Sequence, residues 1–209
     1  MAGYGAVEDA QRPGIPPVRR RGTHRGGRND SVTRATSEWV VDLLDVQPTD
    51  HVLELGFGGG VSIERSASRV SHGFVAGIEA SAVMLNRATQ RVRMAINDWR
   101  VELQIGDAFD LAHEADRFDK VYAVNTVYLW ERPIDVFRQM HRVLKPGGRF
   151  GVGFATLDVM RRMPFTRHGF YFHELSDLQQ WVADAGMRDV QPNMVGTLNE
   201  GSHCILATK

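Results

Sequence analysis

The sequence predicts a single α/β domain: a seven-stranded, mostly parallel sheet with helices on both faces and a C-terminal antiparallel hairpin. Strand-like apolar runs alternate with amphipathic helical patterns through five units, which is typical of a parallel sheet. Two further strand patterns follow the last helix without a helix between them, so one late strand must run antiparallel to its neighbour. A length of 209 residues is enough for one sizeable core.

The first predicted element of this domain is a helix over Ser31–Leu44, with the sequence SVTRATSEWVVDLL. Ser31 is a suitable N-cap, because its hydroxyl can accept a hydrogen bond from a free backbone N–H of the first turn. Apolar residues then recur every three or four positions, which places them on one helical face. The expected buried face consists of Val32, Ala35, Trp39 and Leu43.

The remaining elements are short apolar runs separated by glycine, proline and polar turn signals. Pro133 suits the first position of a helix, and Gly186 suits the residue that follows one. The crossover rule requires right-handed connections between the parallel strands. The predicted strands are 51–55, 73–79, 101–107, 118–125, 149–155, 187–192 and 203–209, and the predicted helices are 63–70, 82–97, 133–144 and 175–185.

Residues 1–30 form a separate N-terminal segment, and the predicted domain spans residues 31–209. The segment is rich in Gly, Pro and Arg and offers little apolar surface to bury, so we expect a mobile tail. A lid over a ligand and a contact to phosphate remain as alternatives. Its arginines lack interleaved aromatic residues, which disfavours nucleic-acid binding.

Composition excludes several classes of protein. Lys+Arg and Asp+Glu number 25 each, so no net charge draws the chain to nucleic acid or to membranes. No apolar run approaches the roughly 20 residues of a membrane helix, and the N-terminus does not resemble a secretory signal, so we expect a cytoplasmic protein. Only three of the cationic residues are lysines, which indicates GC-rich, bacterial coding. Cys204 is the single cysteine and excludes an intramolecular disulfide. We expect no metal, since His168, His173 and Glu174 form only a loose cluster.

The stretch HVLELGFGGGVSIERSASRV, residues 51–70, passes from a predicted strand through a glycine-rich turn into a predicted helix. In open α/β sheets ligands bind beside such a turn, and the helix that follows offers free N–H groups. The glycines fall at alternate positions, Gly56, Gly58 and Gly60. A dinucleotide site requires G-x-G-x-x-G, but Val61 takes the sixth position. Glu54 would also repel a pyrophosphate, so a nicotinamide oxidoreductase is disfavoured.

Glu79 ends the second predicted strand, 19 residues after Gly60. An acid at this position can accept hydrogen bonds from both hydroxyls of a ribose. Because NAD enzymes share this feature, Glu79 indicates a ligand that contains a nucleoside without choosing among such ligands.

Taken together, these motifs resemble those of class I S-adenosylmethionine-dependent methyltransferases, the small bacterial ones in particular. ELGFGGG, residues 54–60, resembles the E/D-x-G-x-G-x-G motif of that family, although Phe57 stands where the family more often has a small residue or cysteine. The likeness continues in order through GIEAS, GDAFDL, FDKVYAVNTVYLW and RVLKPGGRF, and it covers roughly residues 31–209. The resemblance implies a Rossmann-like fold and S-adenosylmethionine as the cofactor.

The resemblance also implies a role for each cofactor-binding position. The backbone of the glycine turn would pass under the methionine part, with Glu54 oriented toward its ammonium group, and Glu79 would take the ribose hydroxyls. Met84 and Asp107 would contact the adenine, while Asn125 would face the cofactor through its backbone. The implied cofactor-binding residues are Glu54, Gly56, Phe57, Gly58, Gly60, Glu79, Ala80, Met84, Asp107, Ala108 and Asn125.

Methyl transfer from a sulfonium requires in-line positioning and exclusion of water more than a strong acid or base. No catalytic side chain is identified, and Tyr128 and His168 are the candidates for one. The segment 156–174 is too long for a simple connection, so we expect it to form part of a substrate wall. Coverage of the sheet edge is the alternative for its aromatics, and packing onto the next helix is the alternative for Tyr128 and Trp130. The expected substrate-wall residues are Trp39, Tyr128, Trp130, Phe165, His168 and Tyr171.

The sequence therefore predicts S-adenosylmethionine-dependent methyl transfer to a small-molecule acceptor. The balanced charge disfavours a nucleic-acid substrate. Two alternatives remain: a non-catalytic S-adenosylmethionine-binding regulatory protein, and an RNA methyltransferase that uses the basic N-terminal tail.

Overall fold

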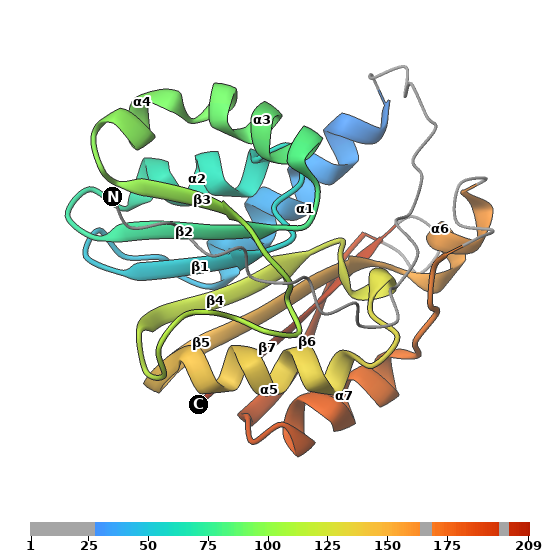
Figure 1. Ribbon diagram of the computed structural model, residues 1–209. Helices are drawn as coiled ribbons and strands as arrows, with labels where there is room; N and C mark the ends of the chain where they lie inside the picture. The colour runs from blue at the N-terminus through green and yellow to red at the C-terminus, as the bar shows by residue number, and fades with distance from the viewer. Residues whose placement is uncertain (1–27, 164–168, 197–200) are drawn as a thin grey trace, which may run out of the picture.

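A computed structural model describes residues 28–163, 169–196 and 201–209 of the chain. Its strands are β1 (His51–Leu55), β2 (Phe74–Glu79), β3 (Val101–Ile105), β4 (Phe118–Val124), β5 (Leu144–Ala155), β6 (Arg188–Val195) and β7 (Ser202–Thr208). They form one seven-stranded sheet in the order β3-β2-β1-β4-β5-β7-β6 (Figure 1). Strands β1 to β5 pair in parallel, whereas β7 runs antiparallel to both β5 and β6. The predicted α/β architecture with an antiparallel C-terminal pair is confirmed.

Helices cover both faces of this sheet. They are α1 (Arg28–Leu43), α2 (Val61–Arg69), α3 (Ala82–Arg91), α4 (Arg93–Asn97), α5 (Pro133–Val143), α6 (Leu157–Arg162) and α7 (Leu175–Asp184), with a short 3-10 helix, η1 (Val127–Leu129). The first four lie on one face and α5 and α7 on the other, while α6 lies beyond the end of β5 (Figure 1). Within the described ranges, no helix has both the length and the apolar character that a membrane crossing requires.

Strand β1 is buried on both faces, and this explains its sequence. Val52 packs in the core beneath α1 and α2, whereas Leu53 and Leu55 pack in the core beneath α5 and α7. A parallel strand buried on both faces reads as a continuous apolar run rather than an alternating one. Glu54 is the exception, an acid placed in the interior near the carboxyl end of the strand.

Helix α1 differs from the prediction in its start and in its buried face. It begins at Arg28, so Ser31 lies inside the helix rather than at its N-cap, and residues 28–30 belong to the helix rather than to a tail. Ala35 is exposed and Trp39 is only partly buried. The buried residues of this segment are Thr36, Ser37, Val40, Val41 and Leu44.

Strand β5 determines which face of α1 is buried. A Cβ at Gly153 would clash with Cγ2 of Val40, so the glycine provides the hollow in which α1 packs. The hydroxyl groups of Thr36 and Ser202 form a hydrogen bond of 3.0 Å in the same contact, which satisfies two buried polar groups. The buried face of α1 therefore depends on packing against a strand that is distant in the sequence. The spacing of apolar residues within α1 could not reveal this face. The side chain of Val32 lies outside the described part.

The largest other differences from the predicted boundaries are in the helix over 82–97 and at the start of β5. The predicted helix over 82–97 is divided at Val92, whose φ of −107° and ψ of 21° leave the helical region between α3 and α4. Strand β5 begins at Leu144 rather than at Arg149, because Leu144 pairs with Phe118 of β4 and the glycines before Arg149 hydrogen-bond with Lys209. The amide of Lys209 donates to the carbonyl of Gly148 at 3.1 Å.

Candidate functional site

The glycine turn joins β1 to α2 at the carboxyl edge of the sheet. Gly56, Gly58 and Gly60 have φ angles of 72°, 52° and 81°, in the left-handed region that other residues rarely adopt. Gly60 also packs against α3, since a Cβ there would lie 2.8 Å from the Cβ of Ala88. A Cβ at Gly58 or Gly59 would meet no described atom within 4 Å. The turn is therefore closed toward α3 and open at Gly58 and Gly59.

Two side chains support this turn. A Cβ at Gly56 would clash with Cγ2 of Thr126, whose hydroxyl oxygen is buried without a hydrogen-bond partner among the described residues. The ring of Phe57 is 4% exposed and packs onto β2, where a Cβ at Gly77 would lie 2.6 Å from it. Gly77 thus provides room for a bulky residue in the motif. Phe57 can offer a ligand its backbone, while its side chain belongs to the core.

Glu79 stands beside the turn, at the end of β2. Its carboxylate accepts hydrogen bonds from the N–H of Gly58 at 2.9 Å and from the N–H of Ser81 at 3.0 Å. The hydroxyl of Ser81 in turn accepts a 3.4 Å hydrogen bond from the N–H of Met84 and caps α3. Two backbone donors fix the carboxylate and leave lone pairs for other donors. Glu79 is therefore held where it can bind hydroxyl groups of a ligand at the turn.

The ends of β2 and β3 bring further predicted residues together. The N–H of Gly106 donates to the carbonyl of Glu79 at 3.2 Å. The carboxylate of Asp107 accepts a 2.9 Å hydrogen bond from the N–H of Phe109, so it stabilises its own turn. Asp107 is nevertheless exposed and keeps acceptor capacity for a ligand. The other predicted residues of this rim are Ala80, which is exposed, and Met84 and Ala108, which are half-buried.

Glu54 does not face the open side of the turn, which corrects the expectation that it points to an ammonium group. It is 1% exposed, and its carboxylate accepts hydrogen bonds from the hydroxyl of Ser62 and, at 3.0 Å, from that of Tyr122. The hydroxyls of Tyr122 and Ser66 are 2.9 Å apart and hydrogen-bonded. Burial raises the pKa of Glu54 to about 8, since desolvation outweighs these donors. Through these hydrogen bonds the buried carboxyl group of Glu54 links β1 to Tyr122 of β4 and to Ser62 of α2.

Asn125 directly follows β4 and lies in the left-handed region, with a φ of 56°. Its N–H donates to the carbonyl of Gly153 at 2.8 Å, and its side-chain oxygen accepts a 3.2 Å hydrogen bond from the hydroxyl of Tyr128. The same hydroxyl accepts a hydrogen bond from the N–H of Ala155. Tyr128 is 4% exposed, and burial raises its pKa above the ordinary value. It connects the ends of β4 and β5, and a group so buried and occupied is not suited to proton transfer.

Trp130 is a core residue rather than part of a substrate wall. It is 5% exposed, and its indole ring lies edge-on to Phe137 of α5 with ring centroids 6.0 Å apart. The structure thus shows the alternative interpretation of the sequence, in which Trp130 packs against the next helix. The error arises because an aromatic residue after a strand can serve either purpose.

A cavity of about 290 Å³ lies at the ends of β5 and β7, between α6 and the start of α7. Two histidine side chains line the cavity. His203 pairs with Phe154 across the two strands, and His173 forms a 3.0 Å hydrogen bond with the carbonyl of Trp130. Burial lowers the pKa of His203, so its ring is neutral near pH 7. The cavity is lined by Phe154, Thr156, Leu157, Asp158, Arg161, His173, Glu174, Leu175 and His203.

The remaining predicted wall residues have different positions. Tyr171 is 41% exposed and stacks on His173 with ring centroids 6.4 Å apart, so it lies beside the cavity. Trp39 packs against the core on the other face of the sheet and does not join it. Phe165 and His168 lie outside the described residues. In the part of the chain that the structure describes, no three side chains of the metal-binding types come together.

Comparison with known proteins gives consistent results. The methyltransferase-domain family matches residues 52–148. YdaC of Bacillus subtilis (strain 168), described as an uncharacterized methyltransferase, is 30% identical over 176 residues, which are 83% of this chain and 91% of that protein. The 27-O-demethylrifamycin SV methyltransferase of Amycolatopsis mediterranei is 32% identical over 124 residues, 59% of this chain and 45% of that protein. A solved SAM dependent methyltransferase from Aquifex aeolicus aligns with a TM-score of 0.70 at 18% identity, covering 87% of this chain and 95% of that one.

Proposed function

This chain belongs to the class I S-adenosylmethionine-dependent methyltransferases, and on that basis we propose that it methylates a small-molecule acceptor. The observation that carries the proposal is the position of Glu79. Its carboxylate is fixed by the N–H groups of Gly58 and Ser81 at the end of β2, next to the open side of the glycine turn. An acid at this place is suited to the hydroxyls of a ribose.

The residues around the turn fit this cofactor. The open space at Gly58 and Gly59 would take the methionine part, since any side chain there would fill it. Glu79 would accept hydrogen bonds from the ribose hydroxyls. The adenine would lie between Met84 and the exposed turn at Asp107. Glu54 would act indirectly, by holding β1 and α2 together beneath the turn.

The cavity at the ends of β5 and β7 is our candidate for the acceptor pocket. In the sheet order, β5 lies directly beside β4, whose end carries Asn125. A volume of about 290 Å³ suits a small molecule, and the lining combines aromatic and polar side chains. The name of the Amycolatopsis relative describes a small-molecule acceptor, which supports the same class here.

Methyl transfer from S-adenosylmethionine requires positioning by the side chains more than acid or base catalysis. When bound, S-adenosylmethionine supplies a methyl group activated by its sulfonium charge. The protein would hold the acceptor in line with that group and exclude water. His203 is a neutral imidazole in the cavity and could accept a proton from an acceptor hydroxyl or amine. Tyr128 would have a structural role.

The test combines binding with transfer. Calorimetric titrations with S-adenosylmethionine, S-adenosylhomocysteine and NAD(H) should show binding of the first two and not of NAD(H). Labelled S-adenosylmethionine incubated with a metabolite extract should then label the small-molecule fraction. Label in added RNA would favour an RNA methyltransferase, and binding without transfer to any acceptor would favour a regulatory protein. Tighter binding of NAD(H) would contradict the proposal.

A further inference from the structure

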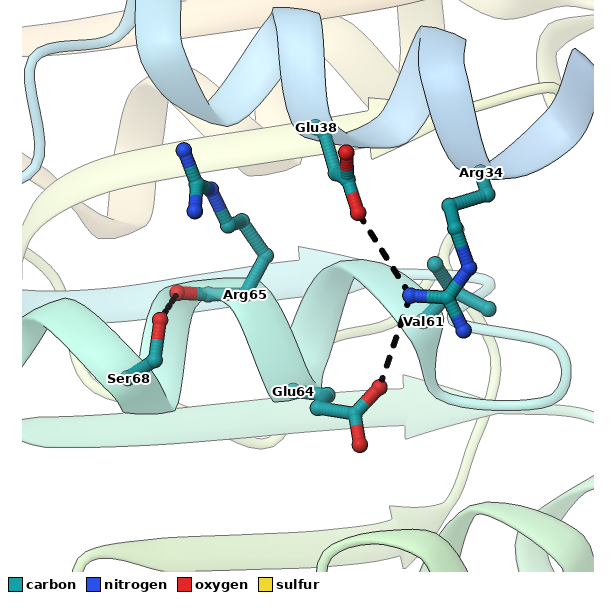
Figure 2. A pocket seen from close by; sticks show the side chains of 6 residues that line it. All are labelled: Arg34, Glu38, Val61, Glu64, Arg65 and Ser68. Atoms are coloured by element: carbon teal, nitrogen blue, oxygen red, sulfur yellow. Dashed lines mark hydrogen bonds and ion pairs between the residues drawn. The ribbon is translucent and has the colours of Figure 1, made fainter. Parts of the chain in front are cut away.

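A charged groove lies between α1 and α2. Figure 2 shows Arg34 reaching across it from α1, with one guanidinium nitrogen 3.4 Å from Glu38 and 3.8 Å from Glu64. Val61 is the first residue of α2 and directly follows Gly60, so the groove borders the cofactor turn. The residues that line the groove are Arg34, Glu38, Val61, Glu64, Arg65 and Ser68.

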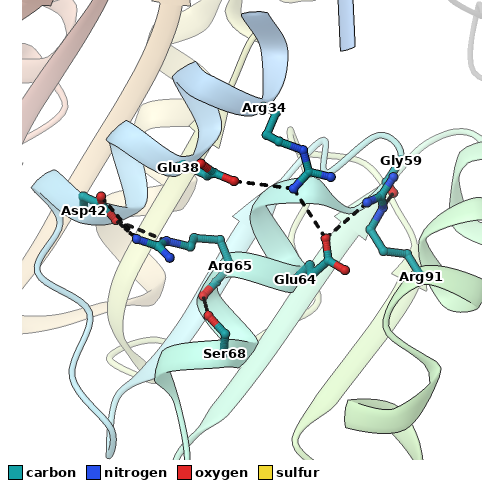
Figure 3. A network of polar contacts seen from close by, with 8 residues as sticks. All are labelled: Arg34, Glu38, Asp42, Gly59, Glu64, Arg65, Ser68 and Arg91. Atoms are coloured by element: carbon teal, nitrogen blue, oxygen red, sulfur yellow. Dashed lines mark hydrogen bonds and ion pairs between the residues drawn. The ribbon is translucent and has the colours of Figure 1, made fainter. Parts of the chain in front are cut away.

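Glu64 connects this groove to α3 (Figure 3). The carboxylate oxygen that faces Arg34 also accepts a 3.1 Å hydrogen bond from Arg91. Through its Nε, Arg91 donates a second hydrogen bond of 2.8 Å to the carbonyl oxygen of Gly59. One guanidinium group therefore holds α2 and the glycine turn at the same time.

Helix α3 thus supports the turn at two adjacent residues. Ala88 packs against Gly60, and Arg91, three residues later on the same helical face, binds the carbonyl of Gly59. On its other side the turn is bound by Glu79, which accepts the N–H of Gly58. The peptide groups of the turn are therefore held from both sides, by an acid beside the open space and by a cation on the outer surface.

We propose that Arg91 is a positioning residue for cofactor binding. It draws the Gly59 carbonyl outward, which keeps the space at Gly58 and Gly59 open, and Glu64 orients it for this contact. The inference rests on the proposed function of the turn. Without Arg91 the Gly59 peptide is free to adopt other orientations. Cofactor binding must then order this peptide, and the conformational entropy that is lost lowers the affinity.

The solvent exposure of these side chains indicates whether their loss will change cofactor affinity or the stability of the fold. Side chains of Arg34, Glu64 and Arg91 are 47%, 45% and 34% exposed. Ion pairs this exposed contribute little to the stability of a fold. Cofactor affinity should therefore change while the melting temperature of the ligand-free protein stays close to that of the wild type.

The experiment measures calorimetric affinity for S-adenosylhomocysteine. Arg91→Ala should weaken binding about tenfold, since it removes charge-assisted hydrogen bonds. Arg91→Lys should be intermediate, because an ammonium lacks the planar fork that serves both acceptors. Arg93→Ala, which removes an equal charge from α4 outside the groove, is the matched control and should bind as the wild type does. Raising the salt concentration should weaken binding in the wild type more than in Arg91→Ala.

A double-mutant cycle separates positioning from a general effect on folding. Arg91→Ala and Glu64→Ala should be non-additive in affinity, because each removes the contact between the two side chains. Additive effects, or unchanged affinity and salt dependence in Arg91→Ala, would overturn the inference. Failure of the wild type to bind S-adenosylhomocysteine would instead contradict the proposed function.

Discussion

The hydroxyl of Tyr122 on β4 donates a 3.0 Å hydrogen bond to Glu54 on β1, beneath the glycine turn. The contact joins residues 68 positions apart in the sequence and turns the acid of the glycine motif into an interior residue. Burial outweighs the two hydroxyl donors, which favour the ionised form, so the carboxyl group keeps its proton up to a pKa of about 8.

Stability should consequently depend on the protonation of Glu54. The folded pKa is about 8 against an ordinary value of 4.5, so between these values the folded state binds a proton that the unfolded state has lost. Its contribution is fully present below about pH 4.5 and is lost as the pH rises through about 8. Glu54→Gln should remove this dependence and be more stable than the wild type at pH 9. Urea unfolding at pH 6 and pH 9 measures both curves, and parallel curves for the two proteins would contradict the assignment.

Removal of the ribose acceptor is expected to affect binding more than folding. Glu79→Ala should weaken affinity for S-adenosylmethionine by roughly ten- to a hundred-fold, because hydrogen bonds to a charged acceptor contribute about 1.5–3 kcal/mol. Glu102→Ala, an exposed acid on the edge strand β3, is the control. Calorimetry and thermal melting should be recorded together. Unchanged affinity in folded Glu79→Ala would show that the carboxylate only supports the turn.

The glycines of the turn should respond differently to substitution. Gly58→Val places a side chain in the open space and should abolish cofactor binding, with a moderate loss of stability from its positive φ. Gly60→Ala meets Ala88 at 2.8 Å in addition to a positive φ of 81°, so it should destabilise the fold more strongly. Unfolding curves and affinities of the two variants test this contrast. Normal binding by Gly58→Val would exclude the turn as the cofactor cradle.

Substitutions in the proposed acceptor cavity should affect methyl transfer without affecting cofactor binding. His203→Ala or Tyr171→Ala should lower the rate of methyl transfer and leave the affinity for S-adenosylhomocysteine unchanged. His51→Ala, at the opposite end of the sheet, is the control. Both rates and melting temperatures are needed, because truncation of Tyr171, which is 41% exposed, should cost far less than the about 3–5 kcal/mol of a buried aromatic. A large drop in melting temperature with normal kinetics in the folded protein would return Tyr171 to a structural role.

The sequence was most informative where one short segment determines the geometry. The alternating glycines form the turn after β1 and the acid ends β2, as the sequence predicts, and the N–H of Gly58 donates a hydrogen bond to the carboxylate of Glu79. Such positions follow from backbone conformation and from strand order. Both are imposed locally, so a single sequence can reveal them.

Features that depend on distant partners were missed or misplaced. The buried face of α1 is decided by Gly153, more than a hundred residues away, and the orientation of Glu54 is decided by Ser62 and Tyr122. His203 enters the cavity because β7 inserts beside β5 and brings it opposite Phe154. Neither spacing nor hydrophobicity encodes these pairings.

The insertion of β7 between β5 and β6 also has a kinetic consequence. Among the described strands, β6 pairs only with β7, so its place in the sheet depends on β7. An opening of the β5–β7 ladder would release both strands at once, as one cooperative unit. Their amide protons should therefore exchange with solvent together, and because His203 is on β7, each such event would briefly dismantle one wall of the cavity.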